Sequence, residues 1–465
     1  TLVTVAFFIN YPGRISPDSL YMLTQAAHPA VLNNWHEPIT TSFWIVFDPI
    51  LLPPAGALLV QSLILLVYPS IMLGRSTISL FSAGLRSPHF EPALFHIVYN
   101  SILIAALVCL AGTILKDVVL AGLIMCILAV VDARELEYTK RVRISLAFIL
   151  LILVSLVRPT NFVILAAVLC TWTYIYVKAW SKRILVTIAI CLFSVALIPA
   201  EKILDRTVFH AQDGHADSSL IIFDAAGIST SIHKDIFREL PGWPSDKLLP
   251  PWRCYSPISW GQFGWGDCEH YSTAFLNLKL NDLAWWIEII AKHPVAYAEH
   301  RARFTYALFA DTYPLASFHN PYALNVNSRL IDYGQYTLGY DMRDRFQLWR
   351  PSIAELPFEW VAAILFSRPM LLVVLAIFLT GVSKAVADWR ARQQVDQTEV
   401  TALAMGIANL VMLAVFGVGA DTRFLLPSFL CAYVVAIRRT LPKRAPLFQV
   451  ASANSLSPGG KRSRS

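Results

Sequence analysis

The stretch SILIAALVCLAGTILKDVVLAGLIMCILAVVDA, residues 101–133, decides the fold class of this chain. It consists of two apolar runs separated by one charged pair, Lys116 and Asp117. Because a helix needs about 20 mostly apolar residues to cross a bilayer, the stretch predicts two membrane-spanning helices joined by a very short loop. The whole chain of 465 residues agrees, with 56% hydrophobic residues, 15% charged residues and a mean hydropathy of +0.54. Soluble domains carry about 25% charged residues, so a cytosolic enzyme, a DNA-binding protein and a disordered scaffold are poor interpretations.

Working outward from this stretch, we expect a mainly α-helical, multi-pass transmembrane bundle of about ten spans. Residues 1–10 are apolar but short, and we expect them to be the outer half of a first helix whose beginning is missing. The later spans are expected near residues 53–74, 92–114, 117–133, 144–157, 161–178, 184–201, 369–386, 399–419 and 424–438. The domains are then an N-terminal bundle (1–201) with an outer loop (11–53), a large mixed or helical extracytoplasmic domain (202–368), C-terminal membrane helices (369–440) and a disordered tail (441–465).

The Lys and Arg residues set the expected orientation, because they collect in short cytoplasmic loops. Alternate short loops and the tail are rich in them, as in Arg134, Lys140, Arg141 and Arg143. The short loops of the opposite face hold Arg14, Lys116, Arg158 and Arg423. We therefore expect a protein of the cell (inner) membrane whose C-terminus is cytoplasmic and whose 202–368 block is periplasmic or extracellular.

Two features of the 202–368 block can be predicted in more detail. Residues 282–309 carry aromatic and aliphatic side chains at helical spacing, and Pro294 should bend or split that helix. Cys254 and Cys268 are the only cysteines of the block, and an oxidising outer compartment favours a disulfide between them. The sequence has neither a phosphate-cradling glycine loop nor a zinc-binding spacing, so an ATP-driven pump is unsupported.

Each polar residue of the outer face has two interpretations. Asp18 suits the N-cap of a helix, or it is a carboxylate at the membrane surface that acts as a base or metal ligand. His36 and Glu37 are interfacial polar residues or parts of a site. Lys116 is a snorkelling anchor neutralised by its neighbour Asp117, or these two also belong to the site.

Lys116, Arg158 and Arg423 share one position, the outer end of a span. Basic side chains grouped at headgroup depth are typical of a lipid-phosphate site, in which Arg offers a rigid fork and Lys a point charge. The alternative is that each cation anchors its own helix. Anchors should scatter around the outer rim, whereas the residues of one site should converge there with Asp18 and Asp117.

Several short motifs together resemble the membrane glycosyltransferases of the C superfamily. They are Pro17-Asp18-Ser19, Gln25-Ala26, Trp35-His36-x-Pro38, Lys116-Asp117, Arg158-Pro159-Thr160-Asn161, His293-Pro294-x-Ala296-Tyr297 with His300-Arg301, and Arg423-Phe424-Leu425-Leu426-Pro427. The motifs are scattered over the whole chain, and none is specific alone. The chain departs from the family pattern at Glu37, where a proline is expected, and it has no paired acid in the first loop.

The resemblance implies an enzyme that takes a sugar from a polyprenyl-phosphate donor on the outer face of the membrane and inverts its anomeric carbon. The implied roles are Asp18 as general base, Asp117 as second acid, His36 as acceptor contact or structural residue, Lys116, Arg158 and Arg423 as phosphate ligands, and Glu37 and Asn161 as acceptor contacts or supporting residues. A divalent cation, Mg²⁺ or Mn²⁺, is left open, with Asp18 and Asp117 as its ligands. The expected partners are the lipid-linked donor and the bilayer, with neither nucleotide nor nucleic acid.

Two other classes of function fit the same composition. One is a polymerase or flippase of lipid-linked oligosaccharides, but flippases tend to lack so large an outer domain. The other is a non-catalytic membrane protein of envelope assembly, in which Asp18 and Asp117 could be replaced without loss of function. The sugar and its acceptor, which is a glycan, a lipid or a protein, are not specified by the sequence.

Overall fold

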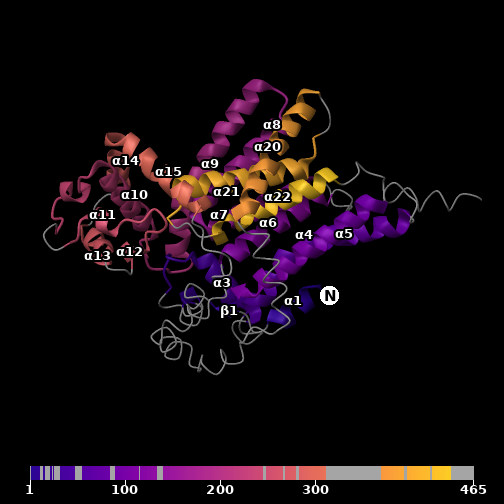
Figure 1. Cartoon of the computed structure of the whole chain (residues 1–465), viewed down its shortest axis with the longest axis horizontal. Helices are drawn as coiled ribbons and strands as arrows, with labels where there is room; N and C mark the ends of the chain where they lie inside the picture. Colours follow the sequence, from indigo (N-terminus) through magenta and orange to yellow (C-terminus); the bar gives the residue numbers. More distant parts are fainter. Residues whose placement is uncertain are drawn as a thin grey trace, which may run out of the picture.

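A computed structural model shows a mainly α-helical molecule, a helix bundle with a lobe beside it (Figure 1). It describes residues 2–10, 14–15, 21–22, 25, 32–47, 55–83, 90–114, 116–133, 140–244, 248–264, 268–278, 282–310, 368–391, 395–418 and 422–440. The predictions for Asp18, for residues 311–367 and for the tail 441–465 lie outside the described residues.

The helices and strands fall into two groups along the chain. The bundle contains α1 (Leu2–Asn10), α3 (Pro38–Phe47), α4 (Ala55–Ala83), α5 (Phe90–Ala111), α6 (Lys116–Asp132), α7 (Lys140–Val157), η2 (Pro159–Asn161), α8 (Phe162–Tyr176), α9 (Trp180–Thr207), α20 (Arg368–Arg390), α21 (Gln397–Phe416), η5 (Thr422–Leu425) and α22 (Leu426–Thr440). The lobe contains α10 (Ala216–Ile232), η3 (Ile236–Glu239), α11 (Pro251–Cys254), α12 (Gly261–Gly264), α13 (His270–Asn277), α14 (Asp282–Lys292) and α15 (Pro294–Ala310). Two short strands, β1 (Arg14–Ile15) and β2 (Thr113–Ile114), pair in parallel.

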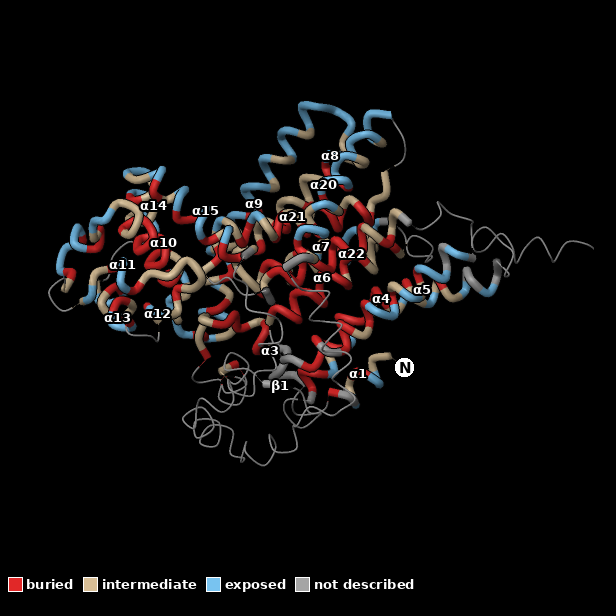
Figure 2. Tube along the Cα trace, in the orientation of Figure 1, coloured by how far each residue is buried: buried red, intermediate tan, exposed pale blue. Residues whose placement is uncertain are grey.

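The core of the bundle is α6, which is buried along most of its length (Figure 2). Its charged residues stand only at its ends, Lys116 and Asp117 at the start and Asp132 at the last position. A helix that is apolar on all sides belongs inside a bundle, and α4, α7, α21 and α22 pack around this one. Gly122 permits a close approach of α4, because a Cβ atom there would lie 2.4 Å from the Ile64 side chain.

Among the described helices, five are long and apolar enough to cross a membrane: Gly56–Ile78, Pro159–Tyr176, Trp180–Thr207, Met370–Arg390 and Gln397–Phe416. Others are shorter, such as α6 with 17 residues and α22 with 15, so the total of about ten spans remains a prediction. Helices α9 and α20 expose large apolar side chains, with Leu192 at 67% and Leu379 at 70%. Such surfaces suit contact with lipid.

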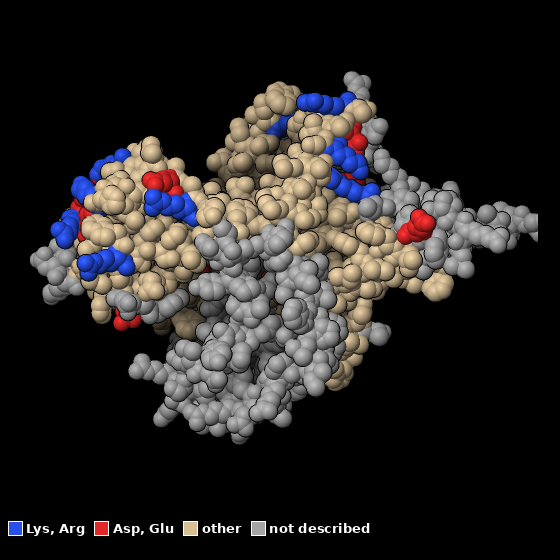
Figure 3. Space-filling model, viewed as in Figure 1, with Lys and Arg blue, Asp and Glu red and all other residues tan. Residues whose placement is uncertain are grey.

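On the face that Figure 3 draws, the described charged side chains lie away from the middle of the bundle. In Figure 3 the described Lys and Arg residues gather over the lobe and at the far end of the bundle, with uncharged surface between them. The helices coincide with the expected spans, but α4 continues to Ala83 and α9 to Thr207. Helix α3 was not expected from the sequence.

The lobe is built around α10, which is buried along most of its length and packs against α11, α13, α14 and α15. The predicted break at Pro294 is confirmed, since α14 ends at Lys292 and α15 begins at Pro294. A proline lacks the N–H that a helix interior needs, but it fits the first turn of a new helix.

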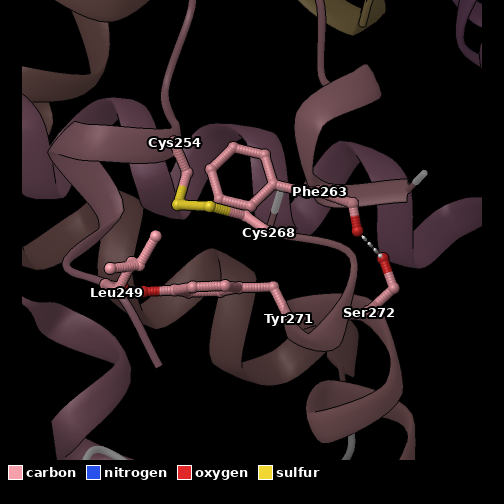
Figure 4. Close-up of a disulfide and its surroundings, with 6 residues drawn as sticks. All are labelled: Leu249, Cys254, Phe263, Cys268, Tyr271 and Ser272. Atoms are coloured by element: carbon pink, nitrogen blue, oxygen red, sulfur yellow. Dashed lines mark hydrogen bonds between the residues drawn. A yellow bond between two sulfur atoms is a disulfide. The ribbon is translucent and has the colours of Figure 1, made fainter. Parts of the chain in front are cut away.

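A disulfide joins Cys254 to Cys268, with their Cα atoms 6.0 Å apart (Figure 4). Both cysteines are buried, and the rings of Phe263 and Tyr271 lie beside the bridge. The Tyr271 hydroxyl donates a hydrogen bond of 2.5 Å to the Leu249 carbonyl. The bridge thus ties the end of α11 to the segment that leads into α13, where the helices are short.

The end of the bundle where α6 finishes carries linked ion pairs. Asp132 pairs with Arg75 of α4 and, at 3.0 Å, with Arg438 of α22. Arg438 also lies 2.6 Å from Asp396, whose carboxylate caps the start of α21. Because every one of these residues sits on a different helix or helix end, the pairs fix four helices together. We name this set the arginine network: Arg75, Asp132, Asp396, Glu399, Arg438 and Arg439.

Candidate functional site

The opposite end of the bundle, where α6 begins, brings together charged residues that are far apart in the sequence. Lys116 is the first residue of α6, and its Nζ lies 2.9 Å from Oε2 of Glu37, 79 positions earlier in the chain. The two side chains are 16% and 9% exposed. This contact fixes the start of α3 to the start of α6.

The next residue of α6 makes a second ion pair. Oδ1 of Asp117 lies 3.4 Å from Nη1 of Arg158, the residue that follows α7. The Arg158 guanidinium also lies 4.4 Å from the centre of the Phe424 ring in η5. Arg423 belongs to η5 as well, although its side chain is outside the described ones. We name Glu37, Lys116, Asp117 and Arg158 the paired-charge site.

The two short strands place the first loop beside the segment that leads into α6. Ile15 of β1 lies opposite Ile114 of β2 in parallel register. In the sequence, Ile15 precedes Asp18 by the same number of positions as Ile114 precedes Asp117. Since Asp18 lies outside the described residues, its meeting with Asp117 remains a prediction.

His36 and Asn161 are both buried next to residues of the paired-charge site. The His36 ring packs against Tyr21, with the ring centres 5.4 Å apart. The Asn161 amide donates a hydrogen bond of 2.9 Å to the Val154 carbonyl at the end of α7. Its Oδ1 is buried and accepts no hydrogen bond from the part of the chain that the structure describes. The ligand contacts predicted for these two residues are untested by this arrangement.

The first loop also contacts the lobe. The Asn34 N–H donates to the Gln212 carbonyl at 3.0 Å, and the Gly214 N–H donates to Oδ1 of Asn34 at 2.6 Å. The Trp35 and Trp260 rings lie 5.4 Å apart. These contacts hold the lobe next to the paired-charge site.

Two buried acids near this site were not singled out by the sequence. Glu201 and Asp205, in the last turns of α9, are each 5% exposed. Both interact electrostatically with Glu37, and Glu201 also with Lys116. The sequence could have indicated them, because carboxylates at the end of a long apolar run are costly to bury and are often functional.

A second group lies where the lobe joins the bundle, and the sequence motifs included its His300 and Arg301 but not its buried acid, Asp224. Asp224 of α10 is fully buried. Its Oδ1 lies 2.9 Å from Nε2 of His300, and its Oδ2 accepts a hydrogen bond of 2.8 Å from Trp286. The Tyr255 hydroxyl lies 2.9 Å from Nδ1 of the same histidine. Gly227 leaves room for this ring, since a Cβ atom there would lie 2.0 Å from Nδ1 of His300.

The same cluster reaches the bundle through Arg301. This side chain lies 2.5 Å from Asp224 and donates a hydrogen bond of 2.7 Å to the Gly417 carbonyl after α21. Burial lowers the pKa of His300 below its usual value, although Asp224 opposes the shift. A neutral ring then donates from Nε2 to Asp224 and accepts at Nδ1 from Tyr255. The cluster therefore attaches the lobe to the end of the bundle that carries the paired-charge site.

The fit of a divalent cation can be tested on the residues present. Within the described ranges, no three His, Cys, Asp or Glu side chains are grouped as metal ligands. Glu37 and Asp117 are each engaged by a cation. The described part of the site does not fit a divalent cation.

Comparison with known proteins gives no relative, since no family model, no curated protein and no solved structure matches this chain. The function has to be argued from the site alone. Its half-buried cations stand beside buried carboxylates at one end of an apolar bundle. This arrangement can hold an anion at a membrane surface and place a base close to it.

Proposed function

We propose that this protein is a membrane glycosyltransferase that moves a sugar from a polyprenyl-phosphate donor to a glycan, lipid or protein of the cell envelope. The observation that carries the proposal is the convergence of the paired-charge site. Segments around residues 37, 116 and 158 meet there, and the adjacent residues Lys116 and Asp117 link the two ion pairs. Independent helix anchors would have no reason to meet, whereas a lipid-linked phosphate needs cations together at headgroup depth.

The proposal includes an orientation. The paired-charge site and the lobe face the outside, and the arginine network and the C-terminus face the cytoplasm. Cationic residues cluster in short loops on the cytoplasmic side of a membrane. The loop rich in Lys and Arg that follows Asp132 is expected on that side, and Asp132 belongs to the arginine network. The disulfide of the lobe supports the same orientation, because such bonds persist in oxidising compartments.

In the proposed reaction, Asp18 accepts the proton of an acceptor hydroxyl, whose oxygen then attacks the anomeric carbon of the donor sugar. The bond from that carbon to the phosphate oxygen breaks, and polyprenyl phosphate leaves with the electron pair. The transition state resembles an oxocarbenium ion, and the leaving phosphate gains negative charge. Lys116, Arg158 and Arg423 stabilise this charge, and Asp117 positions Arg158. Attack from the side opposite the leaving group inverts the anomeric carbon.

The test is a transfer assay with the purified full-length chain and a panel of polyprenyl-phosphate sugars. Asp18→Asn should lower the rate by roughly 10²- to 10⁴-fold, the range of a lost general base. Asp217→Asn is the matched control, because this carboxylate is exposed in an exposed ion pair with Lys202. A wild-type chain that transfers no sugar, or an Asp18→Asn chain as active as the control, would contradict the proposal. Accumulation of intact lipid-linked oligosaccharides in variant cells would favour a polymerase or flippase.

The orientation is tested separately. A reporter that is active only in the cytoplasm should work when fused after Ser465 and fail when inserted after His233, an exposed residue at the end of α10. The reverse pattern would place the paired-charge site on the cytoplasmic side and overturn the proposed location of the reaction.

A further inference from the structure

A shallow groove lies on the bundle near the arginine network, at the end opposite the paired-charge site. It is formed by α6, α7, α8 and the start of α21, and its lining includes Arg143, Ile144, Trp172, Tyr176 and Gln397. Its cavity volume is only about 30 Å³, and the rest of the space at its mouth is open to the surroundings. A groove of this shape can admit a headgroup at its mouth but cannot enclose a whole ligand.

Arg143 is the charged residue of the groove. It stands in the first turn of α7 and is partly buried, and its Nε is covered and has no hydrogen-bond acceptor among the described residues. None of the described residues forms an ion pair with it, in contrast to Arg75, Arg438 and Arg439. Asp396, which precedes Gln397 in the chain, is paired with Arg438. A partly buried cation that has no counterion among the described residues is costly to keep charged, so an anion in the groove would stabilise this arrangement.

The residues around Arg143 indicate what kind of anion the groove is suited to bind. Beyond the groove, α7 exposes apolar side chains, with Val142 49%, Leu146 44% and Ile149 54% exposed. Tyr176, which is 38% exposed, lies in the last turn of α8, a position typical of aromatic residues at the membrane interface. An acyl chain can lie against the apolar face of α7 while the phosphate of the same molecule reaches Arg143.

We propose that this groove binds the headgroup phosphate of an anionic glycerophospholipid in the membrane leaflet at that end. Basic pockets between membrane helices are a known means of holding such headgroups. The Arg143 guanidinium supplies the charge and Gln397 a neutral polar group, while Ile144 and the face of α7 contact the lipid tail. This site does not depend on sugar transfer, and its binding test uses no sugar substrate.

The experiment is native mass spectrometry of the full-length chain in detergent, titrated with phosphatidylglycerol and, separately, with zwitterionic phosphatidylcholine. The wild-type chain should retain phosphatidylglycerol more strongly. Arg143→Gln should weaken that retention by about fivefold, the equivalent of ~1 kcal/mol for one basic residue at a membrane surface. Arg141→Gln is the matched control, because Arg141 is exposed on the same helix turn and does not line the groove. It should change retention by about twofold at most, since exposed charges interact weakly.

A second variant covers the case in which Arg143→Gln fails to fold. Gln397→Glu places a carboxylate in the groove at the first turn of α21, where acids are tolerated, and it should reject phosphatidylglycerol. Equal losses in Arg143→Gln and Arg141→Gln would overturn the site in favour of general surface attraction. Displacement of phosphatidylglycerol by inorganic phosphate at equal concentration would overturn the proposal that the ligand is a lipid, and the groove would then be a site for free phosphate. Unchanged retention in Gln397→Glu would overturn the groove itself.

Discussion

The two ends of the bundle contain similar residues in different arrangements. In the arginine network, Asp132 meets two arginines and Arg438 meets two carboxylates. Among the described residues of the paired-charge site, Lys116 and Arg158 each form one ion pair, the second at 3.4 Å. A cation shared between acids is held by several bonds at once, whereas a singly paired cation can turn toward a ligand. The comparison indicates that one end maintains the bundle and the other is suited to binding.

The strongest test of this comparison is Asp132→Ala. The substitution removes the carboxylate from Arg75 and Arg438 and leaves both cations near the helix ends without it. Loss of one partner from a buried ion pair costs about 3–5 kcal/mol. We expect the free energy of unfolding, measured by denaturant titration in detergent, to fall by that amount. A fall no larger than that of Asp217→Asn, an exposed acid of the lobe, would show that the network does not stabilise the bundle.

Arg158→Gln should give the opposite profile. Transfer should slow by roughly 10²- to 10³-fold, as when one donor to a transition-state anion is lost. The free energy of unfolding should fall by about 1 kcal/mol or less, because a single partly exposed pair contributes little. Arg439→Gln is the matched control, since its pair with Glu399 at 2.9 Å belongs to the network. Arg439→Gln should lose stability and keep its transfer rate per folded molecule. If the two variants changed stability and transfer rate in the same way, the paired-charge site and the arginine network would not differ in role.

The smallest expected effect is the pH dependence of stability that arises from His300 in the lobe. The pKa of His300 is lowered in the folded protein by burial, and its value in the unfolded chain is about 6.5. The unfolded chain therefore binds more protons as the pH falls below that value, so stability is full above it and is lost on acidification. The groups facing the ring are Asp224, Arg301, Arg303 and Tyr255.

The measurement is the unfolding midpoint, followed by tryptophan fluorescence, over a pH series that crosses the usual histidine pKa. Wild-type protein should lose stability below about pH 6.5 more steeply than His300→Gln, which cannot take up this proton. Parallel curves for the two proteins would show that His300 does not couple the lobe to pH. Asp132→Ala should still lose stability at low pH, because the substitution lies in the arginine network, at the end of the bundle opposite His300.

Local sequence patterns predicted the helices well, because each apolar run must bury or immerse its own surface. Pro294 marked a helix break for the same local reason, since it removes one backbone donor. The charge pattern also assigned Arg438 and Arg158 to opposite faces of the membrane, and in the structure they contact opposite ends of α6. What local patterns could not supply was pairing: the Lys116 contact with Glu37 spans 79 positions, and nothing near either residue specifies the other.

The buried acids show a second limit of sequence reasoning. Asp224 sits in an apolar segment, and its partner His300 lies 76 positions later, so only the packing of α10 against α15 brings them together. Glu201 ends the expected span 184–201, and its burial and its interaction with Glu37 make it part of the region around the paired-charge site. The expectation for Asp18 rests on the sequence, because this residue lies outside the described ones.

The arginine network also has a consequence for the order in which the protein is made. Asp132 leaves the ribosome with Arg75 already synthesised, but it reaches Thr398 only 266 positions later, and Arg438 comes later still. Trp172 likewise waits 229 positions for Thr401. During translation Asp132 therefore has only Arg75 of these partners until α21 and α22 have been made. A chain truncated before α21 would keep Arg75 as a partner of Asp132 but would lack Thr398 and Arg438.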